Sequence, residues 1–223
     1  MAKFVEDFGK DLDQNLTDGR LDAPAVHRNS EAILKVLNEL LSGRSGHLIE
    51  IGCGTGQHAI NFAGSFPDLN WWPTDPNPGH IESANAWRAH TGHINIQPAS
   101  ILDASENWKI GKGETLPATD ITAVFSANVI HIAPWSVAEG IISGAAASLD
   151  ADGILIFYGP FSKNGDMLSE GNISFDRSLR NRNSEWGVRD ITQIEEEASR
   201  HNMHLSRIFD MPSNNSMLVL GAL

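Results

Sequence analysis

Three glycines at alternate positions, Gly52, Gly54 and Gly56, follow a short apolar run within LIEIGCGTGQHA, residues 48–59. Because glycine lacks a Cβ atom, this spacing lets the backbone turn sharply and lets a ligand approach the main chain closely. Apolar side chains then recur at helical spacing, at Ala59, Phe62, Ala63 and Phe66. The segment therefore predicts a strand, a tight turn and a helix that together hold a nucleotide.

A carboxylate, Asp75, follows Gly56 by 19 residues, at the end of the next predicted strand. An acid at this place can accept hydrogen bonds from both hydroxyls of a ribose, as in NAD enzymes. The alternative is that Asp75 caps the turn that continues through Pro76, Asn77 and Pro78. The glycine spacing differs from the dinucleotide fingerprint G-x-G-x-x-G, which disfavours a nicotinamide cofactor.

Alternating strand and helix patterns must position these residues. Strands are predicted at 48–51, 69–74, 94–98, 121–127 and 154–158, and helices from Ser30, at 79–90 and at 134–149. This alternation is typical of an α/β fold with a doubly wound parallel sheet and helices on both faces. A helix from Asp190 and a hairpin of strands at 204–210 and 216–220 complete the pattern.

Two further segments do not follow this alternation of strands and helices. Residues 1–26 are polar and are expected to form an N-terminal tail or flap, which leaves 27–223 as a single domain. Residues 160–189 are rich in Asn, Ser, Gly and Arg and are expected to form an inserted lid, with a short helix near 175–182.

The run from Glu50 to Gly56 resembles the E-x-G-x-G-x-G motif of class I S-adenosylmethionine-dependent methyltransferases. The resemblance implies that Glu50, the three glycines and Gln57 hold the amino-acid end of S-adenosylmethionine, with Asp75 on its ribose. It also implies that Leu102 and Asp103 border the adenine and that Asn128 contacts the cofactor. For Asp103, an equally good alternative is a helix cap.

Two residues after predicted strands are catalytic candidates. His131 follows the strand at 121–127, and a neutral imidazole can accept a proton from a hydroxyl nucleophile. The alternative is a packed histidine that holds the loop before Pro134. Tyr158 and Phe161 follow the next strand, where Tyr158 is a second catalytic candidate and Phe161 a substrate contact, unless both are core aromatics.

The expected lid carries a cluster of arginines beside a tryptophan and interleaved acids. An anionic substrate could be bound by the arginine forks, which fit carboxylates and phosphates. Alternatively, the arginines pair with the neighbouring acids and pin the lid. The residues expected to contact substrate here are Arg180, Arg182, Trp186 and Arg189.

A narrower resemblance is carried by WWPTD at 71–75, YGPF at 158–161, FDRSLRNRNSEWGVRD at 175–190 and MPSNN at 211–215. These strings resemble a family with a domain of unknown function, represented in animals by methyltransferase-like protein twenty-six. The resemblance covers 27–220 and implies a seven-stranded Rossmann-like sheet of order 3-2-1-4-5-7-6 with the last strand antiparallel. It places Arg28 and Asn29 near the cofactor and Asn214 and Asn215 on the active side, although an Asn-Asn pair also suits a tight hairpin.

Composition narrows the function classes. The formal charge of −12 disfavours nucleic acid as a partner, and one cysteine, Cys53, excludes an intrachain disulfide. The histidines lack the close spacing of a metal-binding pair, so no metal is expected. Since the sequence has neither a secretory signal nor an apolar run of membrane-spanning length, we expect a cytoplasmic protein.

These observations predict an S-adenosylmethionine-dependent methyltransferase that releases S-adenosylhomocysteine and modifies a small, anionic or aromatic acceptor through oxygen or nitrogen. The alternative is a noncatalytic protein that binds these cofactors and acts through partners.

Overall fold

The computed structural model describes residues 18–108, 116–117, 119–167 and 169–222. Its chain divides into two compact units, which we describe separately. The first contains residues 1–103 and 109–122, and the second contains 104–108 and 123–223. In the described parts of the chain, no helix is long and apolar enough to cross a membrane.

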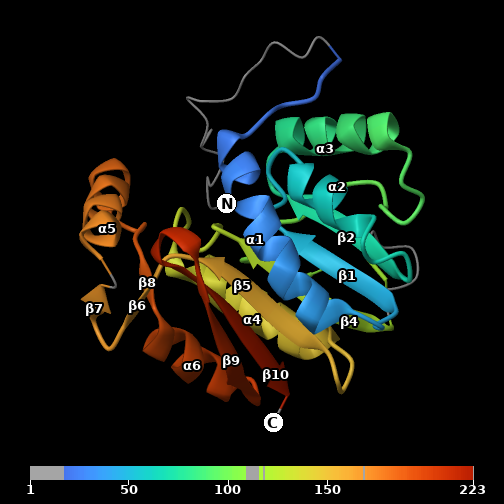
Figure 1. Cartoon of the computed structure of the whole chain (residues 1–223). Coiled ribbons are helices and arrows are strands. Elements are labelled where there is room, and N and C mark those ends of the chain that lie inside the picture. The colour runs from blue at the N-terminus through green and yellow to red at the C-terminus, as the bar shows by residue number, and fades with distance from the viewer. Residues whose placement is uncertain (1–17, 109–115, 118, 168, 223) are drawn as a thin grey trace. The chain divides into compact units, whose positions relative to one another are not determined.

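The first unit is built of helices around parallel strands (Figure 1). Its buried centre includes Leu48, Ile49 and Trp71, none of which exposes any side-chain surface. Helix α2 contacts α1, α3 and β2, while β1 runs parallel to β2 and β2 parallel to β3. In chain order the elements are α1 (Pro24–Leu41), β1 (Gly46–Ile51), α2 (Gln57–Ala63), β2 (Leu69–Asp75), α3 (Pro78–Thr91) and β3 (Ser100–Ile101).

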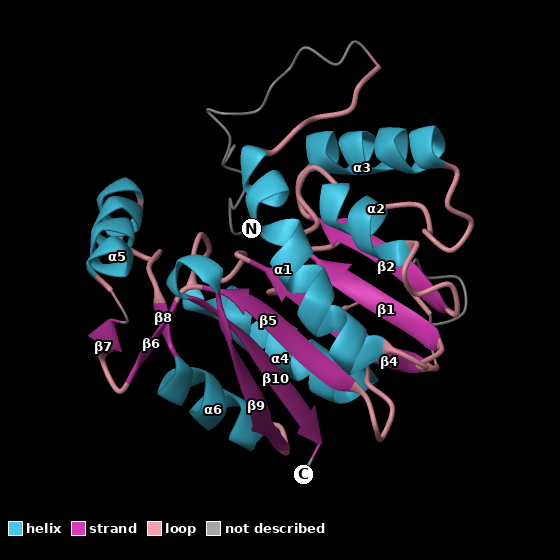
Figure 2. Cartoon of the chain, viewed as in Figure 1, coloured by secondary structure: helices cyan, strands magenta, loops and turns pink. Residues whose placement is uncertain are grey.

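The second unit combines longer strands with a small separate sheet, and Figure 2 shows α5 next to that small sheet. Strand β5 is parallel to β4 and antiparallel to β10, which also pairs with β9. Its elements are β4 (Ile121–Ala127), α4 (Trp135–Ser148), β5 (Ile154–Gly159), β6 (Phe161–Lys163), β7 (Asp166–Met167), α5 (Glu170–Arg182), β8 (Arg189–Asp190), α6 (Ile191–Arg200), β9 (Met203–Met211), the 3₁₀ turn η1 (Pro212–Asn214) and β10 (Asn215–Ala222).

The strand order of the main sheet is β3-β2-β1-β4-β5-β10-β9. Counted in chain order within this sheet, the order is 3-2-1-4-5-7-6, and the seventh strand, β10, is antiparallel to both neighbours. The predicted Rossmann-like fold class is therefore confirmed. The predicted hairpin of the last two strands is confirmed as β9 and β10.

The strand predicted at 94–98 is wrong. Only Ile96 forms a bridge there, with Trp71, and β3 is the two-residue segment Ser100–Ile101. Proline lacks the N–H that a ladder requires, and both neighbouring segments carry a proline at this point. Pro98 precedes β3, and Pro73 lies within β2. Since alternate residues of a strand bond to opposite sides, Pro73 faces the same side as Trp71, where the ladder is interrupted.

Helix α1 begins at Pro24, six residues before the predicted start at Ser30. Proline suits the first turn because its missing N–H would have no helical partner there. Ser30 lies inside the helix, where its hydroxyl donates to the Val26 carbonyl at 2.7 Å, so the predicted start at Ser30 is wrong. Val26 is buried, so this part of the expected tail belongs to the helix.

The expected lid has more regular structure than its composition suggested. It contains the three-stranded sheet of order β7-β6-β8 and helix α5, which begins at Glu170 and not near residue 175. Ser169 caps α5 by accepting a hydrogen bond from Asn172 N at 3.1 Å. The helix predicted from Asp190 is confirmed as α6, which Asp190 caps by accepting from Thr192 N at 2.9 Å.

Candidate functional site: a glycine turn and a buried histidine loop

The glycine turn joins β1 to α2 in the first unit. Gly52, Gly54 and Gly56 have φ angles of +68°, +56° and +87°, a region that favours glycine. A Cβ atom on Gly56 would lie 2.5 Å from Ala84 Cα on α3, whereas among the described residues no atom lies within 4 Å of that position at Gly54. Gly56 therefore lets two helices approach, and Gly54 leaves open space for a ligand.

Asp75 holds the glycine turn from the end of β2. Its Oδ2 accepts a hydrogen bond from Gly54 N at 3.0 Å, and its Oδ1 accepts from Asn77 N at 2.9 Å. The turn-capping role is therefore present, and the ribose contact stays a prediction. His80 Nδ1 lies 3.0 Å from the same Oδ1, a partner that the sequence analysis missed. The only sequence signal for this contact was the position of His80, in the first turn of the helix that follows Asp75.

Glu50 lies beneath the turn and is only 1% exposed. Its Oε2 accepts a hydrogen bond from Trp71 Nε1 at 2.6 Å. Burial raises the pKa of the Glu50 carboxyl from 4.5 to about 8, although the Trp71 hydrogen bond opposes this change and the neighbouring Asp75 adds to it. The side chain is thus buried and bonded to Trp71 in this structure, and its contact with the cofactor stays a prediction.

A Glu50→Gln variant is expected to remove a pH dependence of stability. A raised pKa means that the free energy of unfolding falls as pH rises from 4.5 to about 8, because only the unfolded state ionises there. The slope contributed by one such group approaches about 1.4 kcal/mol per pH unit. Urea midpoints measured across this range should fall less in the variant. Glu31→Gln, at an exposed position on α1, is the control, and equal slopes in both variants would contradict the assignment.

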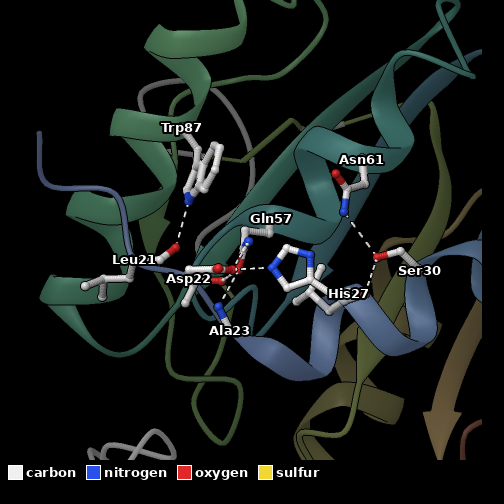
Figure 3. A network of polar contacts seen from close by, with 10 residues as sticks. Leu21, Asp22, Ala23, His27, Ser30, Gln57, Asn61 and Trp87 are labelled. Carbon is white, nitrogen blue, oxygen red and sulfur yellow. Dashed lines mark hydrogen bonds and ion pairs between the residues drawn. The ribbon is translucent and has the colours of Figure 1, made fainter. Parts of the chain in front are cut away.

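Gln57, the first residue of α2, lies within a polar network (Figure 3). Its Nε2 donates to Asp22 Oδ1 at 2.6 Å, and its Oε1 accepts from Ala23 N at 2.7 Å and from Thr55 Oγ1 at 2.9 Å. Because the bonds to Asp22 and Ala23 reach residues before α1 and the bond from Thr55 lies within the turn, Gln57 fixes the N-terminal chain against the glycine turn. Neither Asp22 nor Ala23 was predicted to take part.

The other predicted cofactor residues of this unit differ in exposure. Arg28 is exposed, while Asn29 Oδ1 lies 2.9 Å from the buried ring of His58 and so joins α1 to α2. Leu102 is buried, with its N–H donating to the Asp75 carbonyl at 3.2 Å, and Asp103 is partly exposed. Leu102 is therefore tied to Asp75, and the cofactor contact of Arg28 stays a prediction.

In the second unit, His131 is a buried imidazole in the loop after β4. It is 1% exposed, and in the part of the chain that the structure describes neither ring nitrogen has a hydrogen-bond partner. Its ring meets Phe161 edge to face at 5.1 Å between centroids. Gly159 is required here, since a Cβ atom would lie 2.4 Å from His131 Nε2. The structure thus brings together His131 and Phe161, two of the predicted residues.

Tyr158 and Asn128 lie in the same unit and share a backbone contact. Asn128, at φ +59°, donates its N–H to the Tyr158 carbonyl at 2.8 Å. The Tyr158 hydroxyl accepts from Asn215 Nδ2 at 3.1 Å, and the ring is 3% exposed. Burial raises the pKa of Tyr158, against the hydrogen bond from Asn215. The hydroxyl is therefore protonated at neutral pH.

The Asn-Asn pair was considered alternatively as part of a tight hairpin turn. The positive φ angles of this turn occur at Ser213 (+61°) and Asn214 (+56°), while Asn215 is extended. The Asn214 carbonyl accepts from Asn172 Nδ2 at 3.0 Å, which links α5 to the hairpin. Asn215 has an extended backbone conformation, and its Nδ2 donates to the Tyr158 hydroxyl.

The arginines of the expected lid pin its backbone. Buried Arg189 donates to the carbonyls of Ile130, Ala133 and Glu185. Arg180 pairs with Asp176 at 2.8 Å, and this pair packs on Gly187, where a Cβ atom would lie 2.6 Å from the Arg180 guanidinium. Trp186 is buried and Arg182 is exposed. The pinning role is thus present for Arg180 and Arg189, and substrate contacts by these residues stay a prediction.

The fold is similar to that of several solved structures, two of which are described as O-methyltransferases. The pyocyanin biosynthetic protein PhzM is 14% identical with a TM-score of 0.66, and the alignment covers 87% of this chain and 55% of PhzM. The mitomycin 7-O-methyltransferase MmcR is 15% identical with a TM-score of 0.67, covering 85% and 54%. An O-methyltransferase family 2 protein from Planctomyces limnophilus, in complex with apigenin, is 11% identical with a TM-score of 0.72, covering 89% and 58%.

The chain therefore spans little more than half the length of these structures, and the similarity at these identities concerns the fold. A sequence family described as a protein of unknown function, DUF938, matches residues 20–221. This match extends seven residues before the predicted limit at 27 and includes the start of α1. Because it spans nearly all of the 223 residues, the chain belongs to the DUF938 family.

Proposed function

We propose that this protein is an S-adenosylmethionine-dependent methyltransferase that acts on a small acceptor through oxygen or nitrogen. The observation that carries the proposal is the glycine turn after β1. Gly54 there has open space where a Cβ atom would lie, and its N–H donates to Asp75. This geometry fits a ligand with a ribose close to the main chain. The fold that the chain shares with O-methyltransferases supports the same reaction class.

The residues divide into proposed roles. When bound, S-adenosylmethionine supplies a methyl group on a sulfonium, a carbon already activated for displacement. The chain therefore has to align the acceptor and exclude water more than to perform proton chemistry. We assign Gly52, Gly54 and Gly56 to the amino-acid end, Asp75 to the ribose, and Leu102 with Asp103 to the adenine. Asn128 stays a proposed cofactor contact.

Oxygen is the favoured acceptor atom of the two. The solved structures that share the fold include a mitomycin 7-O-methyltransferase and an O-methyltransferase holding apigenin. By analogy of fold, a small aromatic acceptor with a hydroxyl group is the first class to test. In this proposal His131 is the candidate for removing the hydroxyl proton. Tyr158, protonated at neutral pH, is a candidate hydrogen-bond donor to the acceptor, and Phe161 is a candidate acceptor contact.

Calorimetric titration with S-adenosylhomocysteine tests the cofactor, with NAD as the competing ligand. Binding of S-adenosylhomocysteine and not of NAD is expected, and the reverse result would overturn the proposal. Transfer of a labelled methyl group from S-adenosylmethionine into fractions of a metabolite extract then tests turnover and isolates the acceptor fraction.

An Asp75→Asn variant is expected to bind S-adenosylhomocysteine about 10- to 100-fold more weakly, the effect of a lost charge-assisted hydrogen bond. The measurement is the Kd from calorimetry beside the melting temperature. Asp68→Asn, at an exposed position before β2, is the matched control. An unchanged Kd with a lower melting temperature would leave Asp75 with its turn-capping role alone.

A noncatalytic cofactor-binding protein is the second candidate function. The observation that favours it is the burial of both proposed catalytic residues, since His131 is 1% and Tyr158 3% exposed. Cofactor binding without labelled product in any extract fraction would support this candidate over the enzyme.

A further inference from the structure

Residues 18–23 form a segment that we call the N-terminal strap, and it lies along α3. Leu21 N donates to Ser83 Oγ at 2.9 Å, and Trp87 Nε1 donates to the Leu21 carbonyl at 2.8 Å. The guanidinium of Arg20 lies over the Trp87 ring at 4.6 Å. These contacts fix the backbone on both sides of Leu21 and bring Asp22 to α2 (Figure 3).

The strap is tied to the glycine turn at two places. Gln57 accepts from Ala23 N and from Thr55 Oγ1 through the same Oε1. Ser83 accepts from the strap at Leu21 N and donates to the Thr55 carbonyl at 2.8 Å. Because both bridges end at Thr55, the strap lies next to the turn that the proposed function assigns to the cofactor.

Asp22 is the acid that the strap brings to this place. Its side chain is 32% exposed, and its hydrogen bonds from Gln57 at 2.6 Å and with His27 at 2.7 Å both fall on Oδ1. Among the residues that the structure describes, no side chain donates to Oδ2. One carboxylate oxygen therefore remains open to a ligand while the other is held.

The two acids near the ends of β1 and β2, Glu50 and Asp75, already have hydrogen-bond partners within the protein. Glu50 is 1% exposed and bonded to Trp71. Asp75 is 5% exposed and already contacts Gly54, Asn77 and His80. Asp22 is thus the acid next to the turn with both exposure and an oxygen to offer.

The amino-acid end of S-adenosylmethionine carries an ammonium group as well as a carboxylate. An ammonium group removed from water needs a charged or hydrogen-bonding partner. We propose that Asp22 binds this ammonium group and that Gln57 is the positioning residue that holds the carboxylate at the glycine turn. The inference rests on the proposed function, because it assumes that this cofactor occupies the turn.

The test compares two ligands and two variants by calorimetry with the full chain. The ligands are S-adenosylhomocysteine and its deamino analogue, which lacks only the ammonium group. Asp22→Asn removes the charge, although its amide oxygen can still accept from Gln57. Asp18→Asn is the matched control, since Asp18 belongs to the strap but is exposed and pairs with Arg20.

Asp22→Asn is expected to weaken S-adenosylhomocysteine binding about 10- to 100-fold and to leave the deamino analogue unchanged, as for a lost charge-assisted contact. Asp18→Asn should match the wild type with both ligands. If Asp22→Asn loses affinity for both ligands equally, or for neither, the inference is wrong and the strap is structural.

Two further results distinguish failure of the proposed function from failure of the inference about Asp22. Wild-type protein that binds no S-adenosylhomocysteine overturns the proposed function, and the inference with it. Wild-type protein that binds S-adenosylhomocysteine and its deamino analogue equally well overturns the inference alone, and this comparison needs no variant to fold.

Discussion

Replacing Gly56 with alanine is expected to lower the free energy of unfolding by about 2–5 kcal/mol, from backbone strain and overpacking together. The φ angle of +87° is one that alanine rarely adopts, and the new Cβ would lie 2.5 Å from Ala84 Cα and 2.6 Å from Ala84 Cβ. The contacted atoms belong to the short side chain and backbone of α3, so α2 and α3 have to separate. Urea denaturation should show a lower midpoint with an unchanged slope.

Gly43→Ala is the matched control for this variant. Gly43 has a similar φ angle of +76°, but no described atom lies within 4 Å of its Cβ position. It should lose only about 1–2 kcal/mol, the cost of the left-handed backbone. The difference between the two variants then measures the packing of α2 on α3. Equal losses would show that the contact with Ala84 relaxes without cost.

Most of the sheet could be predicted because its strands and helices carry their own periodic patterns. The strands β4 and β5 are nearly continuous apolar runs, which is typical of parallel strands covered on both faces. The third strand could not be placed, because Ile94 and Ile96 suggested a strand, while only Ile96 forms a bridge and Pro98 interrupts the ladder before Ser100. The start of α1 was missed for a different reason, since its N-cap, Ala23, makes no side-chain capping bond.

The site was predictable in its residue types and less so in their contacts. The glycine spacing and the acid after β2 are local features, and the structure joins Gly54 to Asp75. The burial of Glu50 follows from β1, whose last four residues are buried on both faces whatever their type. The contact between Asp22 and Gln57 spans 35 positions of the chain, so no local pattern could reveal it.

A His131→Ala variant is expected to lower the rate of labelled methyl transfer to the isolated acceptor fraction by about 10²–10⁴-fold, the usual range for a lost general base. Burial is the main cause that lowers the pKa of His131 to about 3, and the nearby Arg189 charge adds to it. The imidazole is therefore neutral above about pH 4 and keeps a free lone pair. Its nitrogens have no partner among the described residues, so no internal hydrogen bond competes for that lone pair.

The pH profile separates this base from an ordinary histidine. A base with a pKa near 6.5 would lose activity as pH falls from 8 to 5. With its pKa lowered to about 3, His131 stays neutral over that whole range, so it should cause no fall in the wild-type rate. A decline centred near pH 6.5 would mean that His131 titrates as an exposed histidine or that another group is the base.

The packing alternative for His131 predicts a different pattern of losses. The ring contacts Phe161 and Gly159, so alanine also leaves a cavity that lowers stability. Val219→Ala, at a buried position on β10, removes core volume in the same unit without removing a titratable group. If both variants lose melting temperature and keep near-normal rates below it, His131 is a packed residue. If only His131→Ala loses the methyl-transfer rate at a temperature where both are folded, the imidazole itself is required.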